Sequence, residues 1–417
     1  MPNGQENAQA QGVWPLADSP AITDSPDKAE PIRFVGNRKG LFWLAFKTGL
    51  WTILTLGLYR FWMKTRMRRW YWSAIRPAGH PFEYVGNPWE KLLGFLIAVV
   101  ILAFYIGIVN LILMFVSFSL LSNNFAAYAV SFIGVIPLWF YARYRARRYV
   151  LARTRWRGVR FGLEPGAWGY AFRALGHWTL TVLTAGLMWP RMTFWLEKYV
   201  TDRTFYGSAR MNQGGDWKML MPAITHAVIG VVFTGGAALS IMQNPAMAWM
   251  LVGSMPWLLY GLVHYSVESR RLLANEKTAG GVGLWSQARP RRIARIYGFG
   301  YVAVFFMLMI PLVPVSVLIV LLEAQEVGLR GDNPFFVWLG TLPRTLLTIV
   351  GVLLYFSVFL FWNVLTQVFL TMPILRHYAQ TLAVTDADKL YDISQRARDE
   401  FAEAEGFAEA LDVGAAL

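Results

Sequence analysis

Charged side chains are absent from four long stretches of the chain and gather between them. No Asp, Glu, Lys or Arg occurs in 92–142, 219–267, 296–322 or 345–375. About 20 apolar residues cross a bilayer as a helix, so each of the first two stretches can hold a pair of spans and each of the last two can hold one. The pattern predicts six transmembrane helices, at about 93–117, 124–142, 219–241, 246–265, 297–321 and 345–372.

Two weaker apolar segments complicate this count. Segment 40–62 contains Lys47 and Arg60, and segment 174–190 is interrupted by His177 and two glycines. If either segment crossed the membrane, the basic residues that follow it would have to be translocated, against the rule that Lys and Arg stay in the cytoplasm. We therefore interpret both segments as re-entrant or interfacial helices. The alternative is that both cross as short, poor spans.

The charge balance supports a membrane protein. The 417-residue chain is 56% hydrophobic and 15% charged, with a formal net charge of +14. Basic residues flank the apolar stretches, and the six-span arrangement places every basic cluster and both termini on the cytoplasmic side. We expect the largest cluster to bind anionic lipid headgroups rather than nucleic acid. Its candidates are Arg143, Arg145, Arg147, Arg148, Arg155, Arg157 and Arg160.

Parts of the chain resemble one another. Leu-Thr-Leu-Gly-Leu-Tyr-Arg at 54–60 is similar to Leu-Thr-Ala-Gly-Leu-Met-Trp at 183–189, and each is followed by a basic helix and a short aromatic segment. These aromatic segments contain glycine and predict short cytoplasmic strands. The expected fold is therefore an all-α integral membrane protein with short strands and an internal repeat. The domains predicted are a disordered cytoplasmic tail (1–30), a membrane domain (31–380) with a tandem repeat at about 40–142 and 174–265, and a polar cytoplasmic tail (381–417).

The same residues carry a family resemblance. Leu54-Thr55-Leu56-Gly57-Leu58-Tyr59, Phe82-Glu83-Tyr84 and Trp156-Arg157-Gly158-Val159-Arg160-Phe161 resemble motifs of the YjgN-type family. This resemblance covers roughly residues 31–380, although Ala185 replaces an expected leucine. The family consists of uncharacterised multi-pass proteins of the bacterial inner membrane. The resemblance therefore implies location and topology, and it implies no particular activity.

Few side chains suggest chemistry. Cysteine is absent, the five histidines show no metal-binding spacing, and no nucleotide-binding or hydrolase motif occurs. We therefore expect no metal, no cofactor and no enzymatic activity. Polar side chains inside a span are functional candidates, although a hydrogen bond to a neighbouring helix is their common role. The candidates for a substrate site or pathway are His226, Asn363, Gln367 and Asn110.

Three functional hypotheses follow. The first is transport, or the handling of a lipid or another envelope component, by binding. The second is a membrane scaffold or regulatory protein that docks a cytoplasmic partner. The third is a membrane enzyme, which the missing nucleophile, metal and acid–base set disfavours. The sequence leaves open whether the chain forms a homo-oligomer or binds a protein partner.

Overall fold

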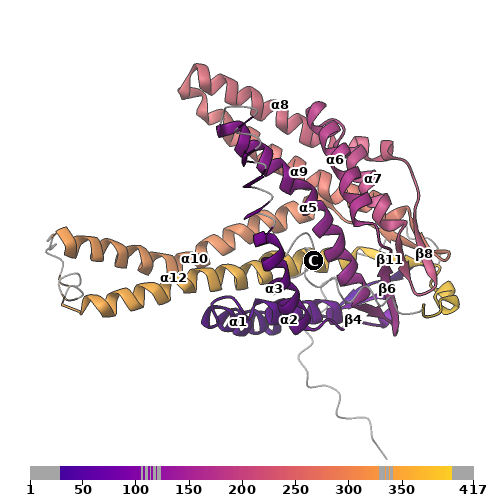
Figure 1. The fold of residues 1–417 in the computed structure, drawn as a ribbon, viewed down its shortest axis with the longest axis horizontal. Helices are drawn as coiled ribbons and strands as arrows, with labels where there is room; N and C mark the ends of the chain where they lie inside the picture. The colour runs from indigo at the N-terminus through magenta and orange to yellow at the C-terminus, as the bar shows by residue number, and fades with distance from the viewer. Residues whose placement is uncertain are drawn as a thin grey trace, which may run out of the picture.

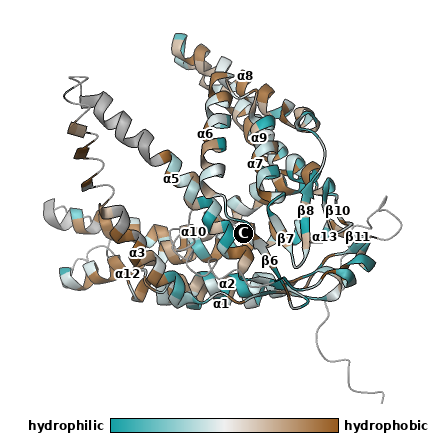
Figure 2. Cartoon of the chain, turned by 45° about the vertical axis from the view of Figure 1, so that its right-hand side comes forward, coloured by the Kyte–Doolittle hydropathy of each residue, from teal (hydrophilic) through white to brown (hydrophobic). Residues whose placement is uncertain are grey.

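A curled antiparallel sheet forms the base of the molecule, and paired helices extend from it (Figure 1). The computed structural model describes residues 29–104, 124–327 and 341–396, with isolated positions between these ranges. Hydrophobic residues concentrate on the helices that extend away from the sheet, and hydrophilic residues gather near it (Figure 2). Residues 1–28 of the predicted tail at 1–30, and the chain after 396, lie outside the described residues.

Antiparallel hairpins account for most of the helices. The helices α1 and α2, α6 and α7, α8 and α9, and α10 and α12 pack as neighbours along the chain. Short 3₁₀ helices, η1 (Pro77–Gly79), η3 (Trp217–Leu220), η4 (Pro245–Trp249) and η6 (Ala387–Asp392), join other elements. The α-helices are α1 (Arg38–Leu54), α2 (Arg60–Ala74), α3 (Pro88–Phe104), α5 (Asn124–Ala152), α6 (Ala167–Leu183), α7 (Trp189–Thr201), α8 (Met221–Gln243), α9 (Met250–Asn275), α10 (Pro290–Val327), α12 (Arg344–Thr366) and α13 (Met372–Gln380).

Four helical segments among the described residues are long and apolar enough to cross a membrane. They are Trp217–Gln243, Pro245–Asn275, Pro290–Val320 and Arg344–Gln380. Each overlaps one of the last four predicted spans. The first predicted pair, 93–117 and 124–142, corresponds to α3 and α5 and falls partly on residues outside the described ranges. Six crossings therefore stay a prediction.

Nine short strands join into one sheet, in the order β1-β11-β10-β9-β8-β7-β6-β5-β4. Every pairing in it is antiparallel, and Leu284, for example, lies opposite Val384. A separate pair, β2 and β3, lies beside it. The strands are β1 (Glu30–Pro31), β2 (Arg33–Phe34), β3 (Ile75–Arg76), β4 (Phe82–Tyr84), β5 (Thr154–Trp156), β6 (Val159–Leu163), β7 (Thr204–Tyr206), β8 (Ala209–Gln213), β9 (Lys277–Ala279), β10 (Val282–Ser286) and β11 (Leu382–Thr385).

Tight turns close the strand hairpins that follow α5, α7 and α9. Arg157 and Gly158 connect β5 to β6 with φ of 52° and 79°, and Gly280 and Gly281 connect β9 to β10 with φ of 57° and 83°. Positive φ at both central residues is the backbone of a two-residue hairpin turn whose twist matches the flanking strands. The glycines of these segments therefore close hairpins, and neighbouring hairpins pair edge to edge.

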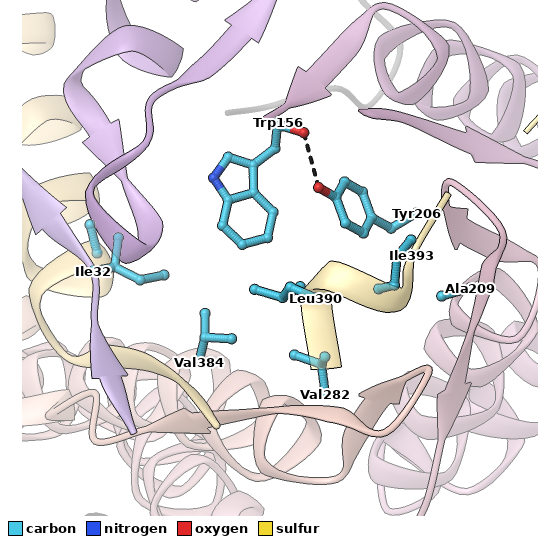
Figure 3. Packing of buried hydrophobic residues seen from close by; sticks show 9 residues of the cluster. Ile32, Trp156, Tyr206, Ala209, Val282, Val384, Leu390 and Ile393 are labelled. Carbon is cyan, nitrogen blue, oxygen red and sulfur yellow. Dashed lines mark hydrogen bonds between the residues drawn. The ribbon is translucent and has the colours of Figure 1, made fainter. Parts of the chain in front are cut away.

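Hydrophobic side chains fill the inside of the curled sheet (Figure 3). Trp156 from β5 and Tyr206 from β7 face each other there, and the Tyr206 hydroxyl donates to the carbonyl of Trp156 at 2.9 Å. The C-terminal turn η6 places Leu390 and Ile393 against them. The interior of the curled sheet is therefore a packed core, closed by a segment that sequence polarity alone marks as part of a tail.

The expected fold class, all-α with short strands, is too narrow and is corrected here. Strands do form at the glycine- and aromatic-containing segments, but they combine into a single nine-stranded sheet. Each strand is only two to five residues long, so no segment shows a sustained alternation of apolar and polar residues. Pairing between hairpins far apart in the sequence is a tertiary contact, which local patterns do not reveal.

Candidate binding cavity between α2, α9, α10 and α12

A cavity of about 600 Å³ lies where α2, α9, α10 and the end of α12 meet. Lys64 and Arg68 reach it from α2, and Arg270 reaches it from the end of α9. None of the side chains that line it is acidic. Arg270 lies over the ring of Tyr378, with its guanidinium carbon 5.7 Å from the ring centre. The cavity therefore has the charge expected of a site for an anion.

Two predicted residues, Asn363 and Gln367, line this cavity together. They lie one helical turn apart on α12 and its continuation, so they present amides on one face. The Asn363 amide nitrogen donates to the sulfur of Met63 at 3.5 Å. Hydrogen-bond donors therefore stand beside the cavity's basic side chains.

Tyr71 fixes the orientation of Gln367. Its hydroxyl donates to the Gln367 side-chain oxygen at 2.8 Å. Tyr71 is fully buried, and this burial raises the pKa of its hydroxyl, so the group stays protonated and acts as the donor. Because the oxygen of Gln367 is occupied in this way, its amide nitrogen is the part that remains to serve the cavity.

The helix is locally wide at this point. Gln367–Thr371 forms a π-helical segment, η5, between α12 and α13. Single π-turns inside helices occur frequently at functional sites, because the wider turn displaces backbone groups from regular pairing. Gln367 and Thr371, which bound the segment, both line the cavity. The irregular backbone therefore coincides with the site.

A second, mostly apolar groove of about 640 Å³ adjoins the cavity between α9 and α10. The two spaces share Arg270, Tyr297 and Tyr301 as walls. From Arg270 the groove extends along α9 to Pro256, which is about 21 Å at the helical rise of 1.5 Å per residue. One leaflet of the hydrocarbon core is about 15 Å thick, so the groove is long enough to follow a lipid tail.

His226 is not among the residues that line the cavity. Its ring lies 4.6 Å from that of His264 and 5.5 Å from that of Tyr260, which itself lines the groove. The His226 Nδ1 atom has no hydrogen-bond partner in the described structure. This histidine therefore stands behind the groove wall, away from Asn363 and Gln367. The fourth candidate, Asn110, lies outside the described residues.

The predicted headgroup arginines lie around α5 and the β5–β6 hairpin, and several contact other parts of the chain. Arg148 is buried and donates to the carbonyl of Leu163 at 2.9 Å. Arg147 lies 3.3 Å from Glu197. Three of the others contact aromatic side chains: Arg143 is exposed and lies over Trp139, Arg145 donates to Tyr141, and Arg157 lies over Tyr391. The last two lie in the hairpin, where Arg155 of β5 is opposite Glu83 of β4 and Arg160 belongs to β6.

The basic side chains of the cavity were not singled out by sequence reasoning. Lys64, Arg68 and Arg270 belong to clusters that the preference for cytoplasmic basic residues already accounts for. The signal that could have pointed to them is the mixture of basic and aromatic residues in α2 and at the end of α9. No group of three or more His, Asp or Glu side chains that could hold a metal ion occurs among the described residues.

Four helices that are long and apolar enough to cross a membrane, with a cationic cavity among the helices, suggest a membrane protein. The sequence model of the family described as "Bacterial protein of unknown function (DUF898)" matches residues 29–410. The chain therefore belongs to this family, which confirms the YjgN-like resemblance. No curated protein and no solved structure has significant similarity to the chain.

Proposed function

We propose that this protein binds an anionic amphiphile from the membrane and handles it without covalent chemistry. The negatively charged headgroup occupies the cavity, and the hydrocarbon tail lies in the groove between α9 and α10. The observation that carries the proposal is that a cationic cavity and an apolar groove lie side by side and share Arg270 and Tyr297 as lining residues.

The order of the basic cavity and the apolar groove along the helices matches the order of headgroups and acyl chains in a bilayer. Arg270 lies near the end of one candidate span, and Tyr297 lies near the start of the next. Pro256, at the other end of the groove, lies well inside a candidate span. Charged and aromatic groups thus stand where headgroups are expected, and apolar groups stand where acyl chains are expected.

The proposed membrane arrangement has six spans, with both termini and the sheet in the cytoplasm of a bacterial inner membrane. In it, the hairpins α1–α2 and α6–α7 dip into the bilayer and return. Support comes from their tips, where Leu56 is 91% exposed and Leu183 is 79% exposed. Such leucines are costly in water and favourable in lipid.

The backbone of these tips also suits lipid. The amide of Gly57 donates to the carbonyl of Thr52, and the Thr55 hydroxyl accepts from the amide of Tyr59. Backbone groups in a bilayer must be paired internally, because no water reaches them there. Thr55, Leu56 and Gly57 correspond to Thr184, Ala185 and Gly186 of the other hairpin, which supports the predicted tandem repeat.

The experiment is purification of the full chain from native membranes, followed by native mass spectrometry of bound lipids and small molecules. We expect an anionic amphiphile to co-purify with the wild-type chain and to be depleted at least fivefold in Arg270→Gln. The matched control is Lys218→Gln, which removes a basic side chain before α8 without touching the cavity.

An identical set of bound molecules in the wild type, Arg270→Gln and Lys218→Gln would refute the cavity as a binding site. Such a result would favour the alternative function, a membrane scaffold that docks a cytoplasmic partner. A loss in both variants would show that general surface charge, and not the cavity, retains the amphiphile.

A further inference from the structure

A second basic pocket, of about 610 Å³, lies outside the central cavity, where α1 begins beside α10. Arg38 is the first residue of α1, and Arg292 and Arg295 lie one turn apart near the start of α10. The rest of the lining is mostly apolar and includes Phe299 and Phe369. This pocket shares no lining residue with the central cavity or with its groove.

The three guanidinium groups have no counter-charge among the residues that the structure describes. None of them forms a hydrogen bond or an ion pair with another described residue, and no acidic side chain lines the pocket. The helix dipole of α1 adds partial positive charge at the same place. Like charges brought together from two helices repel one another, so an anion bound between them is stabilising.

The pocket is held in a fixed shape. A Cβ atom on Gly300 would lie 2.9 Å from the carbonyl oxygen of Phe369, so glycine is what permits α10 to lie this close to η5. At the start of α10, the amide of Arg289 donates to Nε2 of His377 at 3.0 Å. These contacts fix the backbone of α10 against η5 and α13, so the helix that carries Arg292 and Arg295 is in place before any ligand arrives.

Two faces of α10 line two different spaces. Arg292, Arg295 and Phe299 are spaced three and four residues apart and share one face. Tyr297 and Tyr301, which line the central cavity, share another. The basic face continues directly into apolar surface, since Phe299 is 74% exposed at the start of a candidate span. A ligand that fits it has a negatively charged head and a hydrocarbon body.

We infer that this pocket binds a phospholipid whose headgroup carries two phosphates, as in the cardiolipin class. Three guanidinium groups match two phosphates better than one, because each arginine can donate two hydrogen bonds to phosphate oxygens. Basic pockets beside membrane-spanning helices, on the cytoplasmic side, are suited to such headgroups. The acyl chains would lie against Phe299 and Phe369. This inference does not depend on the function proposed for the central cavity.

The test measures lipid binding to the full detergent-purified chain by native mass spectrometry. The probes are a two-phosphate phospholipid, an anionic phospholipid with one phosphate, a zwitterionic phospholipid, and inorganic pyrophosphate. We expect the two-phosphate lipid to bind at least tenfold more tightly than the one-phosphate lipid. Substitution of both Arg292→Gln and Arg295→Gln should weaken its binding about tenfold or more.

Controls separate this pocket from other basic surfaces. Arg291→Gln removes a neighbouring arginine that does not line the pocket, and it should leave the affinity unchanged. Arg270→Gln should also leave it unchanged, although it empties the central cavity. Should the double variant fail to fold, Arg38→Gln at the exposed start of α1 gives the same test with an expected loss of about threefold.

Two results would overturn the inference. One is that the wild type, the Arg292→Gln/Arg295→Gln double variant and Arg38→Gln bind the two-phosphate lipid with equal affinity. The other is full competition by inorganic pyrophosphate at concentrations similar to those of the lipid, because a free phosphate compound would then be the ligand. Failure of this test would leave the central-cavity proposal intact, since Arg270 lies in a separate space.

Discussion

The hairpins α1–α2 and α6–α7 have the same turn, but their second helices contact different parts of the molecule. In the first, the Thr52 hydroxyl lies 3.8 Å from the sulfur of Met63, and in the second Thr181 and Met192 make the same contact at 3.8 Å. The glycine of each turn has a φ near +90°, at 91° and 90°. Two copies of one local structure therefore occur at different places in the fold.

The second helix of each hairpin is where the copies differ. Lys64 and Arg68 of α2 correspond to Thr193 and Glu197 of α7. The basic pair lines the open central cavity. Thr193 instead shares a 2.6 Å hydrogen bond with the hydroxyl of Tyr265.

Glu197 of the second hairpin is held by two basic side chains. It accepts from Lys277 at 2.6 Å and lies 3.3 Å from Arg147. It thereby links α7 to β9 and to α5. The comparison teaches that one backbone serves either as a wall of a binding site or as a structural brace. The difference lies in two corresponding positions, which hold Lys64 and Arg68 in the first hairpin and Thr193 and Glu197 in the second.

The largest expected effect comes from giving the second hairpin the charge of the first. Glu197→Arg would place a third basic group beside Arg147 and Lys277, where an acidic group now holds them together. Losing the pair costs about 2 kcal/mol at this partly exposed side chain, and the repulsion among three basic groups increases this cost. Thermal unfolding in detergent should show a strongly lowered midpoint or no folded protein. A midpoint within one or two degrees of wild type would contradict the bracing role.

A neutral substitution should show a smaller, pH-dependent effect. Burial raises the pKa of the Glu197 carboxyl, but the charges and hydrogen bonds of Lys277 and Arg147 outweigh it and hold the pKa well below the usual range. The stabilisation is therefore complete above the ordinary glutamate pKa of about 4.3 and decreases as pH falls toward the lowered native value.

At pH 7, Glu197→Gln should lose about 2 kcal/mol, less than a fully buried pair because the Glu197 side chain is 24% exposed. The difference between wild type and variant should shrink below about pH 4.3. Unfolding curves of both proteins at pH 7 and pH 4 measure it, and a difference that grows on acidification would be the wrong sign.

Because the two hairpins have the same turn, substituting the turn glycine should lower the stability by the same amount in each. Gly57→Ala and Gly186→Ala each force a side chain into a left-handed backbone conformation, at a cost of about 1 kcal/mol. No atom stands within 4 Å of either added Cβ, so backbone strain is the whole effect. Midpoint shifts measured for the two variants should agree closely. Clearly unequal shifts would show that the surroundings, and not the turn, determine the cost.

The smallest effect is expected when the first hairpin receives the polar residue of the second. Lys64→Thr removes one of three basic groups at the cavity, worth about 1 kcal/mol, or roughly fivefold in affinity for an anionic amphiphile. Lipid titration followed by native mass spectrometry measures the change. Thr193→Val on the other hairpin, which removes a hydroxyl that does not line the cavity, should leave this affinity unaltered.

Part of the candidate site was accessible from sequence, for a clear reason. Asn363 and Gln367 are amides within an uncharged apolar stretch, where any polar group is conspicuous. Lys64 and Arg270 were hidden, because basic residues beside spans are expected everywhere on the cytoplasmic side. His226 was equally conspicuous, yet the structure places it behind the groove wall, since helix rotation decides which way a side chain faces.

By itself, the sequence determined the apolar helices, the sites of the short strands and the matched turns. These depend on neighbouring residues, through hydrophobic length, charge exclusion from lipid and glycine conformation. Only the tertiary structure decided that the strands join into one curled sheet, and that Tyr71 of α2 meets Gln367 at the end of α12. Such contacts join distant segments, and their energy depends on packing that no local pattern encodes.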